Sequence, residues 1–410
     1  MKAVVFTLGC KVNSCESASL MRGLSEMGYE VGEELSYADL YIINTCAVTK
    51  EAEKKSRQAV ARVRKFNENA PIIITGCASE NSPESFINKK GVTLVTGTEY
   101  KDKILNMLEN KGVEIEKHTL EYKESLIPKT SKTRAYIKIQ DGCNNFCSYC
   151  IIPYLRGRSR SRSIISIKRE IELLKPLEAV LTAINLTAYN YENQNLTSLI
   201  NSLSDLNVRI RLGSLEENII TDEFLLALKN LKDFAPHFHL SLQSGSTNTL
   251  KAMNRKYTAE EFLSSINLIR KYFKNAGITT DIIVGFPSET EKDFEDTLEF
   301  VKVAKFSDIH CFPYSAREGT KSYNMNDLPN EVKKQRLDRL LELKNQLKRE
   351  FILNNIDKEL EFITEEFDGK YTLGYTENYV KVYVEGEIKE GKYKVKLIAP
   401  HDDGAIAILI

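Results

Sequence analysis

The sequence predicts an α/β protein in three parts: an N-terminal parallel α/β domain, a central incomplete (β/α)6 barrel and a small C-terminal all-β module. Three observations predict this fold class. Short apolar runs alternate with amphipathic stretches near the N-terminus, six later apolar runs each precede a helix-like pattern, and the chain beyond Asp357 switches to period two. With 410 residues, 42% of them hydrophobic, the chain is long enough to bury two or three cores.

The N-terminal domain is predicted from four apolar runs that read as buried strands, with amphipathic helices between them. The strands are expected at residues 3–8, 39–45, 71–75 and 93–97, and two of the helices at 14–27 and 50–67. Strands that are continuous apolar runs separated by helices are typical of a parallel sheet covered on both faces.

The central domain is predicted from six repeats of strand and helix. The strands are expected at residues 134–140, 179–185, 208–214, 237–242, 279–286 and 307–313, and a long amphipathic helix at 330–351 closes the domain. We therefore expect an N-terminal domain at 1–112, a charged linker at 113–132, the partial barrel with its closing helix at 133–355 and the β-rich domain at 356–410.

Composition excludes several classes of function. Lys plus Arg and Asp plus Glu number 57 each, so nucleic-acid binding would need a local basic patch. The sequence contains neither an apolar run long enough to span a bilayer nor a signal-peptide core, so we expect a cytoplasmic protein without a membrane partner. Eight cysteines in a reducing compartment are then explained by metal binding, catalysis or packing, not by disulfides.

The strongest chemical signal follows the first predicted barrel strand, where Cys143, Cys147 and Cys150 have the spacing C-x3-C-x2-C. Three thiolates on a tight loop suit a 4Fe-4S cluster whose fourth iron has no protein ligand. Structural zinc would need a fourth Cys or His nearby, and none follows within 80 residues. The spacing is similar to the motif of the radical S-adenosylmethionine superfamily, in which the open iron binds S-adenosylmethionine and an electron cleaves it to a 5′-deoxyadenosyl radical. Tyr149 would stack near the adenine or shield the cluster.

Three more cysteines end successive strands of the N-terminal domain. Cys10 follows the first, Cys46 ends the second and Cys77 ends the third, so all three should emerge at the carboxyl edge of one parallel sheet. They would converge on a second cluster with an open iron. Cys15 and Cys311 have no such partners and are interpreted as core thiols.

The motifs together resemble the radical S-adenosylmethionine methylthiotransferases over nearly the whole chain. The resemblance rests on the segments 8–13 (LGCKVN), 44–46 (NTC), 75–77 (TGC), 143–153, 242–246 (LQSGS) and 374–379 (GYTENY). It implies replacement of an unactivated C–H by C–SCH3, two 4Fe-4S clusters, S-adenosylmethionine as methyl and radical source, an electron donor such as flavodoxin or ferredoxin, and a C-terminal TRAM-like barrel. The cluster on Cys10, Cys46 and Cys77 would carry the sulfur.

The resemblance also suggests cofactor contacts. Glu216, Gln243 and Gly285 would face the nucleoside or the methionine end, although Gly285 and the polar residues also fit as plain turn-shaping and capping residues. One departure is Ala183, which stands where the family usually has glycine, and puts a backbone contact to the cofactor in doubt unless its φ is negative.

For the substrate, residues 9–13 (GCKVN) resemble the enzymes that methylthiolate C2 of N6-threonylcarbamoyladenosine beside the anticodon of tRNA. Arg156, Arg158, Arg160 and Arg162 would bind the phosphates and the carboxylate of that substrate, unless the run is only a solvated face. The tail from residue 356 carries 12 acidic against seven basic residues, which keeps open an alternative substrate, an Asp of a basic ribosomal protein. Isopentenyladenosine in tRNA and, more remotely, a non-catalytic iron-sulfur RNA-binding role remain alternatives.

Overall fold

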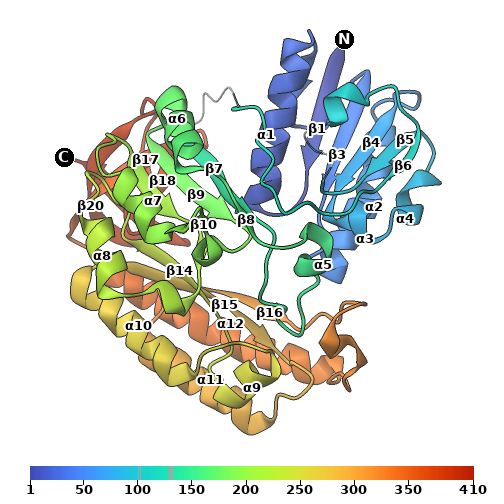
Figure 1. Cartoon of the computed structure of the whole chain (residues 1–410). Helices are drawn as coiled ribbons and strands as arrows, with labels where there is room; N and C mark the ends of the chain where they lie inside the picture. Colours follow the sequence, from blue (N-terminus) through green and yellow to red (C-terminus); the bar gives the residue numbers. More distant parts are fainter. Residues whose placement is uncertain (100, 102, 129–132) are drawn as a thin grey trace.

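The computed structural model describes residues 1–410 except 100, 102 and 129–132, and it confirms the predicted fold class. A parallel α/β domain, a partial barrel and a closed β-barrel follow one another along the chain, and the two outer domains both pack against the central one (Figure 1). Within the part of the chain that the structure describes, no helix is long and apolar enough to cross a membrane.

The N-terminal domain is built on a six-stranded parallel sheet in the order β2-β1-β3-β4-β5-β6. The strands are β1 (Lys2–Thr7), β2 (Glu30–Gly32), β3 (Leu40–Thr45), β4 (Ile72–Gly76), β5 (Val92–Thr96) and β6 (Gly112–Glu114). The helical elements are α1 (Lys11–Glu26), α2 (Lys50–Arg64), α3 (Cys77–Asn81), α4 (Glu84–Ile87) and the 3-10 turn η1 (Ile104–Asn106). The four predicted strands lie within one residue of their expected bounds. The two edge strands were missed because three residues are too short to show a pattern, and β6 carries the sheet beyond the expected boundary at 112.

Both faces of this sheet are buried, which explains why its strands are continuous apolar runs. Val4 and Ile43 pack on one side, and Val5 and Ile42 pack on the other, each completely buried. Because both faces of the sheet are buried, polar and sulfur-containing side chains for a site can come only from the segments that follow the strands at the carboxyl edge.

The central domain contains two four-stranded sheets, β12-β9-β7-β8 and β13-β14-β15-β16, which are parallel except for the antiparallel edge strand β8, and helices lie on their outer face (Figure 1). Its strands are β7 (Arg134–Asp141), β8 (Arg160–Ser161), β9 (Glu178–Ala183), β12 (Arg209–Leu212), β13 (Ser214–Leu215), β14 (His237–Gln243), β15 (Gly277–Val284) and β16 (Asp308–Pro313), and a hairpin is formed by β10 (Asn190–Tyr191) and β11 (Gln194–Asn195). Its helices are α5 (Ile152–Arg156), α6 (Ile164–Leu174), α7 (Leu196–Ser202), α8 (Asp222–Lys229), α9 (Thr247–Ala252), α10 (Ala259–Tyr272), α11 (Glu291–Ala304) and α12 (Asn330–Leu353), with 3-10 turns η2 (Leu186–Ala188), η3 (Glu217–Ile219) and η4 (Lys321–Asn324). All six predicted strands are present, and α12 is the predicted closing helix.

The two faces of the central sheet differ in chemistry. Phe238 and Leu240 of β14 point into the core beneath the helices, whereas His239 of the same strand faces the opposite, concave side. On β15 the same alternation buries Ile282 and turns Asp281 to the concave side. The concave side is therefore the polar side, and it faces the N-terminal domain.

The C-terminal domain is a closed five-stranded barrel in the order β17-β18-β19-β21-β20. The strands are β17 (Glu359–Phe367), β18 (Tyr371–Thr376), β19 (Lys381–Glu385), β20 (Lys392–His401) and β21 (Gly404–Leu409). Glu361 forms an ion pair with Arg209 and Glu365 forms one with Arg134, both arginines lying in the central domain. Part of the acidic excess of this domain is thus used at the interface between domains.

The segment between the first two domains packs against both of them, except for residues 129–132 of the expected linker, which lie outside the described residues. Burial alone would raise the pKa of Glu99, but a hydrogen bond with His118 and the charges of Arg160 and Lys123 lower it to about 2. Glu99 thereby joins the N-terminal domain, the linker and the central domain.

Candidate functional site

The carboxyl edge of the N-terminal sheet brings three cysteines together. The register pairs Thr45 of β3 with Gly76 of β4, so Cys46, in the loop after β3, and Cys77, the first residue of α3, lie at the same level of the sheet edge. Cys10 caps the N-terminus of α1 at the end of the loop after β1. Gly9 has φ +113°, and a Cβ there would stand 3.1 Å from Cys46 Sγ, so the loop of Cys10 passes directly against Cys46.

The second set of cysteines lies on the loop between β7 and α5. Cys147 is buried, and Cys143 and Cys150 are half-buried. The loop is folded back by positive φ at Gly142 (71°) and Phe146 (48°), and Cys150 N–H donates to Cys147 O at 3.0 Å. Such a loop concentrates three thiols in a short segment at the carboxyl end of a barrel strand.

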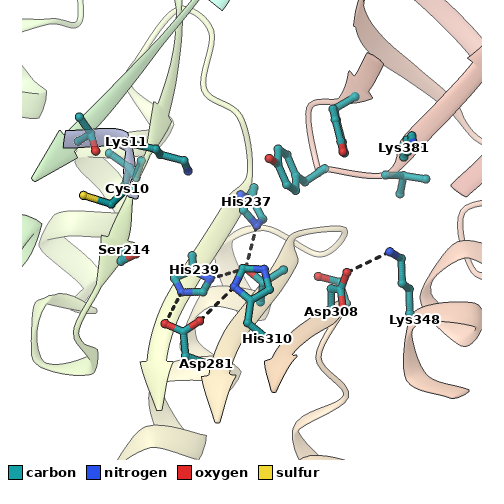
Figure 2. A pocket seen from close by; sticks show the side chains of 18 of the residues that line it. Cys10, Lys11, Ser214, His237, His239, Asp281, Asp308, His310, Lys348 and Lys381 are labelled. Atoms are coloured by element: carbon teal, nitrogen blue, oxygen red, sulfur yellow. Dashed lines mark hydrogen bonds and ion pairs between the residues drawn. The ribbon is translucent and has the colours of Figure 1, made fainter. Parts of the chain in front are cut away.

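Both sets line one cavity of about 440 Å³ between the two domains. A larger cavity of about 800 Å³ adjoins it, reaches the C-terminal barrel and shares Cys10, Ala183, Ser214 and Asp281 with the first. Figure 2 shows Cys10 and Ser214 on one wall of this larger cavity and the polar side chains of β14 and β15 on the other. A molecule bound across the two cavities would reach both groups of sulfur atoms.

A cation lies beside each group of sulfur atoms. Arg156 Nε is 3.3 Å from Cys77 Sγ, and Arg255 Nη1 is 3.3 Å from Cys147 Sγ. Burial raises the pKa of Cys46 to about 11 and that of Cys150 to about 12, so ligation of a metal at these positions releases protons. Positive charge beside buried sulfur suits anionic thiolate ligands better than neutral core thiols.

Arg156 belongs to a buried network of charges where the two domains meet. Its members are the cations Lys101, Lys138, Arg156 and Arg160 and the carboxylates of Glu16, Glu99 and Asp141. With the partly exposed Lys123, which also pairs with Glu99, five cations face three carboxylates, and a thiolate at Cys77 would offset part of this excess. The network therefore fits an anionic sulfur site at Cys77.

Comparison with known proteins identifies both domains. Residues 137–301 match the model of the radical SAM superfamily, and residues 2–97 match an uncharacterized protein family, UPF0004. The chain is 39% identical to the threonylcarbamoyladenosine tRNA methylthiotransferase MtaB of Bacillus subtilis, over 98% of this chain and 96% of that one. The chain belongs to the radical SAM methylthiotransferase family. It is also 35% identical to a tRNA-2-methylthio-N(6)-dimethylallyladenosine synthase of Clostridium tetani, over 95% of this chain and 86% of the relative.

Among solved structures, the fold is similar to that of the radical S-adenosylmethionine methyltransferase TsrM from Kitasatospora setae. The TM-score is 0.59 at 14% identity, covering 79% of this chain and 77% of that one. Membership of the radical SAM superfamily implies S-adenosylmethionine and a 4Fe-4S cluster, and the sulfur donors present fit such a cluster: Cys143, Cys147 and Cys150, which line the smaller cavity, would supply three thiolate ligands.

In this methylthiotransferase the predicted arginine surface is not formed. Arg156, Arg160 and Arg162 are between 1% and 8% exposed, and each is paired with carboxylates of the protein. The prediction that they bind the phosphates or the carboxylate of a substrate is wrong for these three, because their charges are already neutralised. Arg158 alone is exposed, with its guanidinium 4.5 Å from the centre of the Phe146 ring.

Four of the five predicted cofactor contacts line the smaller cavity: Tyr149, Ala183, Glu216 and Gln243. Ala183 ends β9 and is not among the residues with positive φ, so its methyl group causes no backbone strain. Gly285 does not line the cavity. Its φ is +72°, its N–H donates to Glu289, and a Cβ would stand 2.5 Å from Lys333 Cγ of α12, so it shapes a turn beneath the closing helix.

The sequence analysis predicted Glu216 but not the three residues that hold it. Glu216 accepts hydrogen bonds from Asn145 at 2.6 Å and Asn185 at 3.3 Å and lies 3.0 Å from Arg255, so it fixes the cysteine loop to its neighbours. These partners come from three different segments of the chain, and no local pattern in the sequence marks them.

A second missed group lies at the centre of the larger cavity. Asp281 carboxylate oxygens are 3.2 Å from His239 Nε2 and 3.0 Å from His310 Nδ1 (Figure 2). Burial alone would raise the pKa of Asp281, but the hydrogen bonds with both histidines hold it below its usual range. The three ligand atoms lie within 4.8 Å of one another, and among the described His, Cys, Asp and Glu side chains this is the one group of three that lies so close together, a spacing that could hold a single metal ion.

Proposed function

We propose that this enzyme methylthiolates C2 of N6-threonylcarbamoyladenosine next to the anticodon of tRNA, using two 4Fe-4S clusters. The observation that carries the proposal is that two separate sets of three cysteines open into one cavity, which continues into a second cavity large enough for a modified base. Relatives at 36% to 39% identity, named for this tRNA reaction, support the choice of substrate.

The second cluster is proposed on Cys10, Cys46 and Cys77. It is supported by their placement at one sheet edge and by the guanidinium of Arg156, whose Nε lies 3.3 Å from Cys77 Sγ. When bound, the two clusters and S-adenosylmethionine supply a 5′-deoxyadenosyl radical and a methylthio group.

The protein's own residues then have positioning tasks. Glu216, held by Asn145, Asn185 and Arg255, lines the cavity beside the cysteine loop and is placed to accept from a cofactor amino group or ribose hydroxyl. The N-terminal domain forms one side of this cavity, so both cysteine sets are presented to the same bound molecule. The electron donor is proposed to be a flavodoxin or ferredoxin.

The C-terminal barrel is proposed to be a TRAM-like domain that contacts tRNA. Its Tyr379 is stacked between His237 and Tyr375, with ring centres 4.3 and 4.5 Å away, so these rings form an internal stack and Tyr379 has no free face for a base.

A cytoplasmic location is proposed because all eight cysteines are free.

Iron content tests the two clusters. Anaerobically reconstituted protein should bind about eight irons, and Cys143→Ala should lose about half of them, because the other thiolate set is separate. Changing Cys10, Cys46 and Cys77 together to Ala should preserve reductive cleavage of S-adenosylmethionine but abolish methylthio product. Product formation by the triple variant would show that the N-terminal cysteines do not deliver sulfur.

Substrate choice is tested with tRNA from cells with and without threonylcarbamoylation. Only the modified tRNA should gain a methylthio group, and binding should weaken steeply as salt rises. Equal turnover of isopentenyladenosine tRNA would assign the enzyme to the other tRNA subfamily. Methylthiolation of a ribosomal protein would favour that substrate instead, and no product on either tRNA or protein would favour the non-catalytic alternative.

A further inference from the structure

The larger cavity contains a lysine, Lys11, that has no ion-pair partner among the described residues. Three lysines line it: Lys11, Lys348 and Lys381. Lys348 Nζ is 3.1 Å from Asp308, and Lys381 Nζ is 3.1 Å from Asp403. Among the residues that the structure describes, none forms an ion pair or side-chain hydrogen bond with Lys11, and Figure 2 shows its ammonium directed into the cavity without a partner.

The stability of α1 does not explain this lysine. Lys11 is the first residue of the helix, where the positive end of the helix dipole disfavours a cation, and the first turn contains no acidic residue to compensate. The side chain is exposed to the cavity instead of packing against the protein. Its charge is therefore available to a ligand.

The position of Lys11 relates it to the proposed chemistry. Lys11 follows Cys10, and Cys10 lines both cavities. In adenine, C2 and the N6 substituent flank N1 on the same edge of the ring. A base that presents C2 toward Cys10 therefore directs its N6 substituent along the same wall, into the larger cavity.

We infer that Lys11 is a specificity-determining residue, which binds the carboxylate of an acidic N6 substituent on the substrate adenosine. The inference rests on the proposed function and deepens it. A carboxylate entering this cavity needs a cation to replace its water, and the other two lysines are already neutralised. An apolar dimethylallyl group would form no favourable contact with the ammonium of Lys11 and would leave that charge unpaired. Lys11 should therefore strengthen binding of the acidic substituent and disfavour the apolar one.

Binding of matched stem-loops tests the inference. Two anticodon stem-loops are compared, one with N6-threonylcarbamoyladenosine and one in which the threonine carboxylate is a carboxamide. Their Kd values are measured with reconstituted protein and S-adenosylmethionine, without reductant. The wild type should prefer the acid by about 10- to 100-fold, as expected for one charge-assisted contact. Lys11→Met should reduce that preference to less than about threefold, and Lys11→Arg should keep most of it.

Lys381→Met is the matched control, a lysine of the same cavity whose charge is already paired, and it should retain the wild-type preference. Iron content and circular dichroism establish that each variant is folded and loaded. An undiminished preference in Lys11→Met, or an equal loss in Lys381→Met, would overturn the inference while leaving the function intact. If the wild type, once reduced, methylthiolates neither stem-loop, the proposed function itself fails.

Discussion

Removing the guanidinium of Arg156 is expected to destabilise the junction between the first two domains. This side chain is 1% exposed. It donates to Asn13 Oδ1 at 2.7 Å, to Glu16 at 2.9 and 3.2 Å and to Asp141 at 3.2 Å, and its Nε lies 3.3 Å from Cys77 Sγ. Arg156→Met keeps much of the apolar volume but deletes every one of these contacts.

The expected loss of unfolding free energy depends on how many cations the carboxylates of Glu16 and Asp141 keep once Arg156 is removed. Breaking a buried ion pair by removing one partner costs about 3–5 kcal/mol, because the other charge stays buried. Here Glu16 keeps Lys101 and Lys138, and Asp141 keeps Lys138. The loss should therefore lie at the lower end, about 3 kcal/mol of unfolding free energy.

The measurement is urea unfolding of the metal-free protein, followed by far-ultraviolet circular dichroism because the chain has no tryptophan. Arg158→Met is the matched control: it changes an arginine two residues away that is exposed and packs only on the Phe146 ring, and it should cost less than about 1 kcal/mol. An Arg156→Met variant no less stable than Arg158→Met would refute the interpretation of the buried network.

Three further predictions test other parts of the structure. The stability advantage of the wild type over Glu99→Gln should be complete above about pH 4.5 and shrink as the pH falls toward 2, because the folded state lowers the pKa of this carboxyl; a pH-independent difference in melting temperature would contradict it. Gly9→Ala places a Cβ 3.1 Å from Cys46 Sγ at φ +113°, so reconstituted protein should lose about half its iron yet still cleave S-adenosylmethionine; full iron content would contradict it. Gly285→Ala should cost about 1–2 kcal/mol of stability through its φ and the contact with Lys333, while KM for S-adenosylmethionine stays unchanged; a raised KM would restore its role as a cofactor contact.

The sequence pattern was sufficient to predict those features that depend on a single helix, strand or loop. The spacing of Cys143, Cys147 and Cys150 lies within one loop, and the cysteines at the ends of three strands follow from parallel topology alone. The period-two pattern also predicted the β-rich C-terminal domain, and its closure into a barrel, which the family resemblance implied, is confirmed by the structure. Edge strands β2 and β6 were not predicted, because a half-exposed strand of three residues is too short to show a periodic pattern of apolar residues.

The sequence by itself determined the order of the domains, the strands of both sheets and the two sets of cysteines, because backbone periodicity and ligand spacing are properties of short segments. Only the tertiary structure decided which charges are free. Arg156, Arg160 and Arg162 look like a basic surface in the sequence, yet carboxylates from distant segments neutralise them in the interior. Lys11, one lysine among many in the sequence, is left without a partner in the cavity. Pairing between residues remote in the chain is set by how domains pack, and no local pattern records it.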